Sequence, residues 1–249
     1  MKATMRTASR PRRLMAIVSG AVFLWLVAGS GQAADLSSSG AQPVDLTSTY
    51  LLPLSTLTNE HYFASSAWKS VPTGHQVFHN VPLEIGGQIR LWGEGRNDGY
   101  TDRFPKEIRD IAVNRKFETL YVYHGSGFRS PDGTPVWELV FRYEDGSSAT
   151  NTLRFGADVL DWMVGGNEEP LRTPYATNSM IAWVGGQYSE KQNNRLRFCI
   201  TALNNPHPDR LVATIDLISC RSKTAASILA MTTGPAGLMK GNISRKKPD

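Results

Sequence analysis

The alternation of apolar and polar residues is clearest between residues 135 and 155. Apolar side chains occupy every second position from Trp137 to Tyr143, an Asp145-Gly146 pair follows, and the alternation resumes at Leu153 and Phe155. An Asp-Gly pair between two alternating segments is a strong signal for two antiparallel strands joined by a tight turn. The pattern therefore predicts a β-hairpin in this region.

Short apolar stretches separated by turn residues continue through the chain. The segment 117–125, FETLYVYHG, carries apolar residues on both faces, which predicts a strand buried on both sides. The best helical candidate is the short PKEIRDIA at 105–112. Many short strands and little helical periodicity predict an all-β protein, an antiparallel β-sandwich of eight to ten strands. Further strands are expected in HQVFHNVPLEI leading into GGQIRLWG, in NRLRFCITAL, in DRLVATIDLIS and in SILAMTT.

The two ends of the chain differ from this strand-rich part. A basic start, an uncharged core over residues 14–29 and a run of small residues predict a signal peptide at 1–33, cleaved after Ala33. The alternative is an uncleaved membrane anchor, although the run is shorter than the ~20 residues that a spanning helix needs. We expect a linker at 34–43, one β-sandwich domain at 44–234 and a flexible basic tail at 235–249. The protein would then be periplasmic, at the cell surface or extracellular, with no membrane span.

Removing the signal peptide changes the charge of the protein. The chain has 27 Lys and Arg residues against 22 Asp and Glu residues, and five of the basic residues and none of the acidic ones precede residue 34. The mature chain therefore has a net charge near zero. Because binding to nucleic acid depends on a basic surface, this balance argues against a nucleic-acid partner.

The chain has two cysteines, Cys199 and Cys220. In an exported protein they could form a disulfide, which would close a loop and stabilise the fold by roughly 3 kcal/mol. The alternative is a pair of buried thiols. No clustered Cys and His spacing is present, which argues against a zinc or haem site.

The order of short motifs along the chain resembles that of a known domain. HNVPLEIGGQIRL, FETLYVYHGSGF, DGTPVWELVFRYEDGS and LNNPHPDRLVATIDLIS follow one another as in the galactose-binding-like (discoidin-type jelly-roll) domain, which is similar to carbohydrate-binding modules. The resemblance covers nearly the whole mature chain. It implies a jelly-roll sandwich that binds sugar or another surface ligand without catalysing a reaction. Met163 and Leu203 stand where such domains tend to carry a flat aromatic residue.

Candidate ligand-binding residues lie in two loops. Sugar binding needs flat aromatic rings with polar side chains beside them. We predict such a site from Trp92, Arg96 and Tyr100 in one loop, with His124 and Arg129 in a neighbouring one.

The other tryptophans of the mature chain have different expected places. Trp68 lies in a predicted loop and is a second binding candidate. We expect Trp137 and Trp183 in the core, because both lie within apolar segments.

The first loop also carries oxygen ligands. Asn97, Asp98 and Asp102 surround a glycine in GRNDGYTD, and calcium prefers such oxygen-rich loops. Domains of the resembling class often hold a structural calcium ion, so the resemblance implies calcium as an option, and no other cofactor is required. The alternative is a plain polar turn.

An acidic corner, FGADVLDW at 155–162, follows the hairpin. We expect Val159 and Trp162 to turn inward and Asp158 and Asp161 to accept hydrogen bonds from backbone amides, so that the corner plugs the end of the sandwich.

Two alternative functions belong to other classes. One is a small secreted glycan-active hydrolase using Asp158 or Glu168, although nothing in the spacing selects these carboxylates. The other is a protein-interaction module of an envelope assembly, which an exposed apolar patch would mark.

Overall fold

The computed structural model describes residues 40–54, 67–95, 104–165, 172–189 and 194–240, all of which lie in one compact unit, Asp35–Asp249. It is an all-β structure in which antiparallel sheets pack as a sandwich, which confirms the predicted fold class. Besides strands, the described ranges contain the short 3-10 helices η1 (Thr47–Thr49) and η3 (Trp68–Ser70). None of their helices is long and apolar enough to span a membrane.

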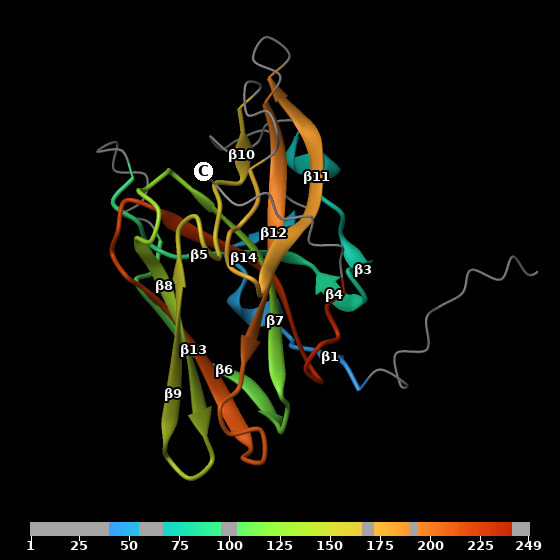
Figure 1. Ribbon diagram of the computed structural model, residues 1–249, viewed down its shortest axis with the longest axis vertical. Coiled ribbons are helices and arrows are strands. Elements are labelled where there is room, and N and C mark those ends of the chain that lie inside the picture. The colour runs from blue at the N-terminus through green and yellow to red at the C-terminus, as the bar shows by residue number, and fades with distance from the viewer. Residues whose placement is uncertain (1–39, 55–66, 96–103, 166–171, 190–193, 241–249) are drawn as a thin grey trace, which may run out of the picture. The chain divides into compact units, whose positions relative to one another are not determined.

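The larger sheet is formed mainly by long strands from the second half of the chain. Its order is β10-β12-β7-β14-β5-β2. In addition, β11 pairs with β12, and β1 pairs with β14. Figure 1 shows β11, β12 and β7 running alongside one another. The strands are β1 (Gln42–Pro43), β2 (Leu52–Pro53), β5 (Gly87–Arg90), β7 (Thr119–Gly127), β10 (Met163–Val164), β11 (Ser179–Ser189), β12 (Asn194–Asn204) and β14 (Ala225–Gly234).

The smaller sheet contains the predicted hairpin. Its order is β6-β13-β8-β9, with β6 (Glu107–Arg115), β13 (Val212–Ser219), β8 (Pro135–Tyr143) and β9 (Ser148–Arg154). Trp137 pairs with Leu153, and Gly146 has a positive φ of 82° in the turn, so the hairpin prediction is confirmed.

The helical interpretation of PKEIRDIA is wrong, because most of this segment forms the start of β6. The pairing of β6 with β13 places Ile111 and Val113, two residues apart, in the core. Their separation of two is the period of a strand, and the neighbouring charged residues lie on the exposed face. Tertiary pairing thus overrides a weak local helical preference.

A third layer is a hairpin of β3 (Gly74–Phe78) and β4 (Val81–Ile85). The sequence suggested one strand here, but His79 and Asn80 have φ values of 52° and 67° and form the turn. Positive φ at both central residues is the requirement for the tight two-residue turn that matches strand twist.

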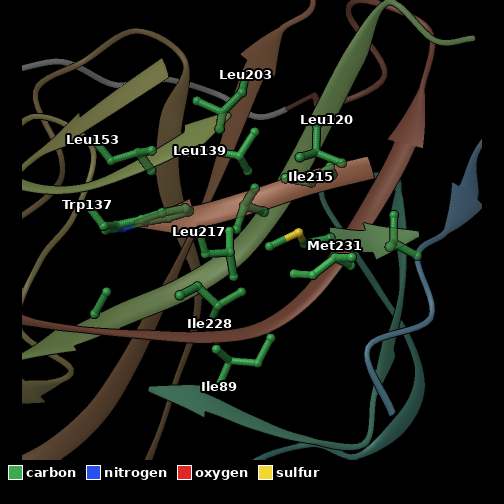
Figure 2. Close-up of a cluster of buried hydrophobic side chains, with 14 of the residues drawn as sticks. Ile89, Leu120, Trp137, Leu139, Leu153, Leu203, Ile215, Leu217, Ile228 and Met231 are labelled. Carbon is green, nitrogen blue, oxygen red and sulfur yellow. The ribbon is translucent and has the colours of Figure 1, made fainter. Parts of the chain in front are cut away.

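Two hydrophobic cores result from these three layers. The first lies between the two sheets and contains Trp137, Ile215 and Ile228 (Figure 2). The second lies between the larger sheet and the β3–β4 hairpin with η3. In β7, Leu120 and Val122 enter the first core while Tyr121 and Tyr123 enter the second. This confirms the prediction that the 117–125 strand is buried on both faces.

Candidate functional site

The connection from β5 to β6 crosses from the larger to the smaller sheet at one end of the sandwich and carries Trp92. The Trp92 amide donates to the carbonyl oxygen of Pro105 at 2.8 Å, and the Ser219 hydroxyl donates to the Trp92 carbonyl oxygen at 2.6 Å. The Trp92 ring is half-buried, with the Lys106 ammonium 5.7 Å from its centroid. Trp92 is therefore an aromatic surface on a fixed backbone, beside a cation.

The predicted ligand residues Arg96 and Tyr100, and the predicted calcium ligands Asn97, Asp98 and Asp102, lie outside the described residues. Their roles stay predictions. Within the described ranges, no group of three or more His, Cys, Asp or Glu residues could hold a metal ion.

The described residues on either side of 96–103 are fixed to neighbouring elements. The amides of Glu94 and Gly95 donate to the carbonyl oxygens of Ser222 and Lys223 at 2.8 and 2.9 Å. On the returning side, the buried Arg90 guanidinium lies 4.6 Å above the ring of Phe104. The two stems of the loop are thus held against the 219–224 turn and the larger sheet.

Arg129 lies in the loop 128–134, beside residues 91–95, called here the Trp92 segment. It is exposed, and its Nε lies 3.5 Å from Oδ2 of Asp161. Thr224 links the two loops, because its hydroxyl donates to Ser130 Oγ at 2.6 Å and its backbone packs directly against Gly93. The structure therefore brings the Trp92 segment and the Arg129 loop together at one end of the sandwich.

His124 does not lie in this loop, and its predicted placement is wrong. Strand β7 continues past His124 to Gly127 because β14 pairs with it along this whole length. The imidazole is completely buried, with its ring edge against Trp137 at a centroid distance of 6.0 Å. Burial lowers the pKa of His124 to about 3. His124 is therefore a neutral interior residue with no access to a surface ligand.

The Thr201 hydroxyl is the centre of a buried group of hydrogen bonds. It donates to the Asp158 carbonyl oxygen at 3.3 Å. Its oxygen also lies 2.8 Å from His124 Nε2 and 2.8 Å from the Ser179 hydroxyl oxygen. A buried polar chain thus connects β7, β11 and β12 to the acidic corner.

The two cysteines are free thiols, so the disulfide alternative is not formed. Cys199 is buried in β12, opposite His124 of β7, whereas Cys220 follows β13 of the other sheet and is half-buried. Burial raises the pKa of Cys199 to about 12 and that of Cys220 to about 11. Neither thiol is in the reactive thiolate form at neutral pH.

The carboxylates of the acidic corner serve the backbone, as predicted. Asp158 Oδ2 accepts a hydrogen bond from the amide of Arg154 at 2.8 Å, and Asp161 Oδ1 accepts one from the amide of Met163 at 3.0 Å. Burial raises the pKa of both carboxyl groups above the usual range. The nearby charges of Arg129 and Arg197 act in the opposite direction on Asp161.

The apolar residues of the corner point inward but into different cores. Val159 belongs to the core between the sheets, and Trp162 belongs to the second core. The Trp162 ring packs edge-on against Trp68 at a centroid distance of 5.4 Å. The corner is thus anchored on both sides of the larger sheet.

The prediction for Trp68 is wrong, and Trp183 packs against the second core but is less buried than predicted. Trp68, expected in a surface loop, is only 2% exposed in the second core. Trp183, expected in the core, is half-buried at the sheet edge, where its ring stacks on Phe198 at 6.0 Å. Trp137 is buried, as predicted. A tryptophan beside small polar residues can therefore still be a core residue when its short helix packs onto a sheet.

Two exposed residues at this end of the sandwich, Lys106 and Tyr175, have no local sequence pattern that predicts their place. Lys106 is fourteen positions from Trp92 in the sequence and meets it only through the crossing connection. Tyr175 lies in a segment without strand periodicity and is 52% exposed.

Comparison of the chain with protein-family models, curated proteins and solved structures finds no match. The resemblance to galactose-binding-like domains therefore stays a prediction beyond the β-sandwich itself.

Proposed function

We propose that the chain is an exported, non-catalytic module that binds carbohydrate, or another extracellular or cell-surface ligand, at the end of the sandwich. The binding surface, called here the rim, consists of Trp92, Lys106 and Arg129. The observation that carries the proposal is the half-buried Trp92 ring on a backbone fixed at the meeting point of two loops. Loops at one end of a rigid scaffold are where binding residues commonly lie.

The side chains around Trp92 suit a polar ligand with apolar faces. An aromatic ring can pack against the apolar face of a sugar, while neighbouring charged groups reach hydroxyl oxygens. Lys106 lies over the indole ring at 5.7 Å. Since an exposed cation–π contact is worth only about 0.5–1 kcal/mol, a ligand could displace the ammonium at small cost.

The hydrogen bonds of Asp158 and Asp161 in the acidic corner favour a binding function over a hydrolase that uses these aspartates. A glycosidase needs two carboxyl groups facing a cleft on either side of the scissile bond. Asp158 and Asp161 each accept a hydrogen bond from the main chain, and the Asp161 side chain is only 8% exposed. Glu168, the other predicted catalytic residue, lies outside the described ranges.

A glycan-array screen followed by affinity electrophoresis of the full chain tests this proposal. Wild type should bind a defined glycan, and Trp92→Ala should weaken that binding about tenfold or more, as expected for an aromatic anchor. Trp183→Ala is the matched control, because Trp183 is also half-buried but packs on Phe198 of the second core. Absence of any glycan ligand would contradict carbohydrate binding, and unchanged binding by Trp92→Ala would contradict the rim.

A further inference from the structure

A second exposed aromatic residue lies beside the acidic corner. Tyr175 is 52% exposed, the largest exposed fraction among the large apolar and aromatic residues of the described chain. Its amide donates to the Gly156 carbonyl oxygen at 3.1 Å, and the next amide, of Ala176, donates to Ala157 at 3.1 Å. The backbone that carries the exposed ring is therefore fastened to the corner by two successive hydrogen bonds.

An exposed ion pair lies against the same glycine. Arg172 Nη2 pairs with Asp132 Oδ1, and their side chains are 40% and 52% exposed. Gly156 has a positive φ of 79°, and a Cβ atom there would collide with Asp132 and crowd Arg172. The absence of a side chain at Gly156 thus allows the ion pair to sit directly beside the backbone that holds Tyr175.

The position of Arg172 is set by the interior. Buried Arg197 donates from Nη1 to the Arg172 carbonyl oxygen at 3.1 Å and from Nε to the Asp161 carbonyl oxygen at 3.0 Å. The Arg172 guanidinium itself lies 5.9 Å from the ring centroid of the buried Phe155. The exposed groups are thus held by buried ones before any ligand arrives, which lowers the entropy lost on binding.

We propose that Tyr175, Arg172 and Asp132 form a subsite for a neutral sugar unit. The phenol ring offers a flat face to the apolar side of a pyranose, and the ion pair offers an acceptor and a donor for neighbouring hydroxyl groups. Because Arg172 and Asp132 neutralise each other, the subsite favours an uncharged sugar over a uronate or a sulfated sugar. This inference rests on the proposed function as a carbohydrate-binding module.

The subsite adjoins the rim through one short loop. Arg129 of the rim and Asp132 of the subsite lie three positions apart in the loop 128–134, which Thr224 also ties to the Trp92 segment. We therefore expect a ligand that contacts both surfaces to be an oligosaccharide with a neutral unit over Tyr175.

Isothermal titration of the full chain with neutral gluco-, manno-, xylo- and galacto-oligosaccharides, from mono- to hexasaccharides, tests the subsite. Tyr175→Ala should raise Kd about fivefold or more, since it removes the aromatic anchor. Tyr175→Phe should stay close to wild type, because it keeps the ring face. Asp132→Asn should also weaken binding. Val77→Ala is the matched control, because Val77 is 47% exposed on β3 of the separate hairpin.

The outcomes separate the subsite from the proposed function. Binding that Trp92→Ala weakens but Tyr175→Ala leaves unchanged would overturn the subsite and leave the rim in place. Binding that depends on Tyr175 and not on Trp92 would support the subsite and contradict the rim. A wild type that binds none of these neutral saccharides overturns the subsite, and failure on the glycan array as well overturns carbohydrate binding by this chain.

Discussion

The acidic corner and the rim contain similar residues at the same end of the sandwich but use them in different ways. In the corner, both aspartates accept backbone hydrogen bonds, and Trp162 is 6% exposed in the second core. At the rim, Trp92 is half-buried and Arg129 is exposed. Aspartate, arginine and tryptophan near a loop therefore do not by themselves identify a binding site. What distinguishes the two regions is that aspartate side chains accept hydrogen bonds from backbone amides in the corner, whereas main-chain carbonyl oxygens do so along the Trp92 segment.

The backbone explains this difference. After β9 ends at Arg154, the chain turns sharply, and the amides of Arg154 and Met163 are satisfied by aspartate side chains. Along the Trp92 segment, the amides of Trp92, Glu94 and Gly95 find main-chain carbonyl oxygens instead. The corner therefore depends on its side chains for backbone hydrogen bonds, whereas the Trp92 segment is held by main-chain groups.

The largest expected difference in stability is between truncation of Trp162 and truncation of Trp92. Trp162→Ala should lower the free energy of unfolding by about 3–5 kcal/mol, because it opens a cavity in the second core. Trp92→Ala should cost about 1 kcal/mol or less, since its ring is half-buried at the surface. Urea denaturation of both variants measures the two values. Equal losses would show that Trp92 is as much a structural residue as Trp162.

The second prediction concerns pH and His124, which lies beneath the corner. Its pKa is about 3 in the folded chain against about 6.5 when unfolded. Between these values the unfolded chain binds a proton that the folded chain does not, so stability falls as pH falls. The expected slope is about 1.4 kcal/mol per pH unit. The full contribution of His124 to the free energy of unfolding is present above pH ~6.5 and is lost towards pH ~3.

The matched variant for this prediction is His124→Gln, which can still form a hydrogen bond with Thr201 but does not titrate. Urea denaturation of wild type and variant from neutral to acidic pH compares the two slopes. The other titrating groups are common to both proteins, so the difference between the slopes isolates His124. Parallel curves would mean that His124 has the same pKa in the folded and unfolded chains, which contradicts its burial.

Regular strands were predictable from the sequence because their signals are local. The alternation in β8 and β9 with Asp145-Gly146 between them, and the two apolar faces of β7, gave the hairpin and the central strand. The misread elements depend on distant partners. Most of segment 105–112 is a strand because β13 pairs with it. The turn at His79-Asn80 has positive φ at both residues, a conformation that glycine adopts more often than His or Asn.

The candidate site was predictable only in part, for the same reason. Trp92 and Arg129 could be selected as loop residues, but their proximity arises through Thr224, far from both in sequence. His124 looked like the end of a strand, and only the pairing of β7 with β14 shows that the strand continues. Tyr175 had no local pattern, because its place beside Arg172 and Asp132 depends on Gly156 and on the buried Arg197.

The smallest expected effects come from removing either side chain of the Arg129–Asp161 ion pair, which joins the corner to the rim. Asp161→Ala should cost about 1–3 kcal/mol, because the amide of Met163 loses its buried acceptor. Arg129→Ala should cost less than about 1 kcal/mol, since its side chain is 53% exposed and a surface ion pair contributes little. Chemical denaturation gives both values, and Asp161→Asn, which keeps an acceptor oxygen, should fall between them. If Arg129→Ala proved the more damaging change, the arginine would belong to the structural corner, and its place in a ligand-binding rim would be lost.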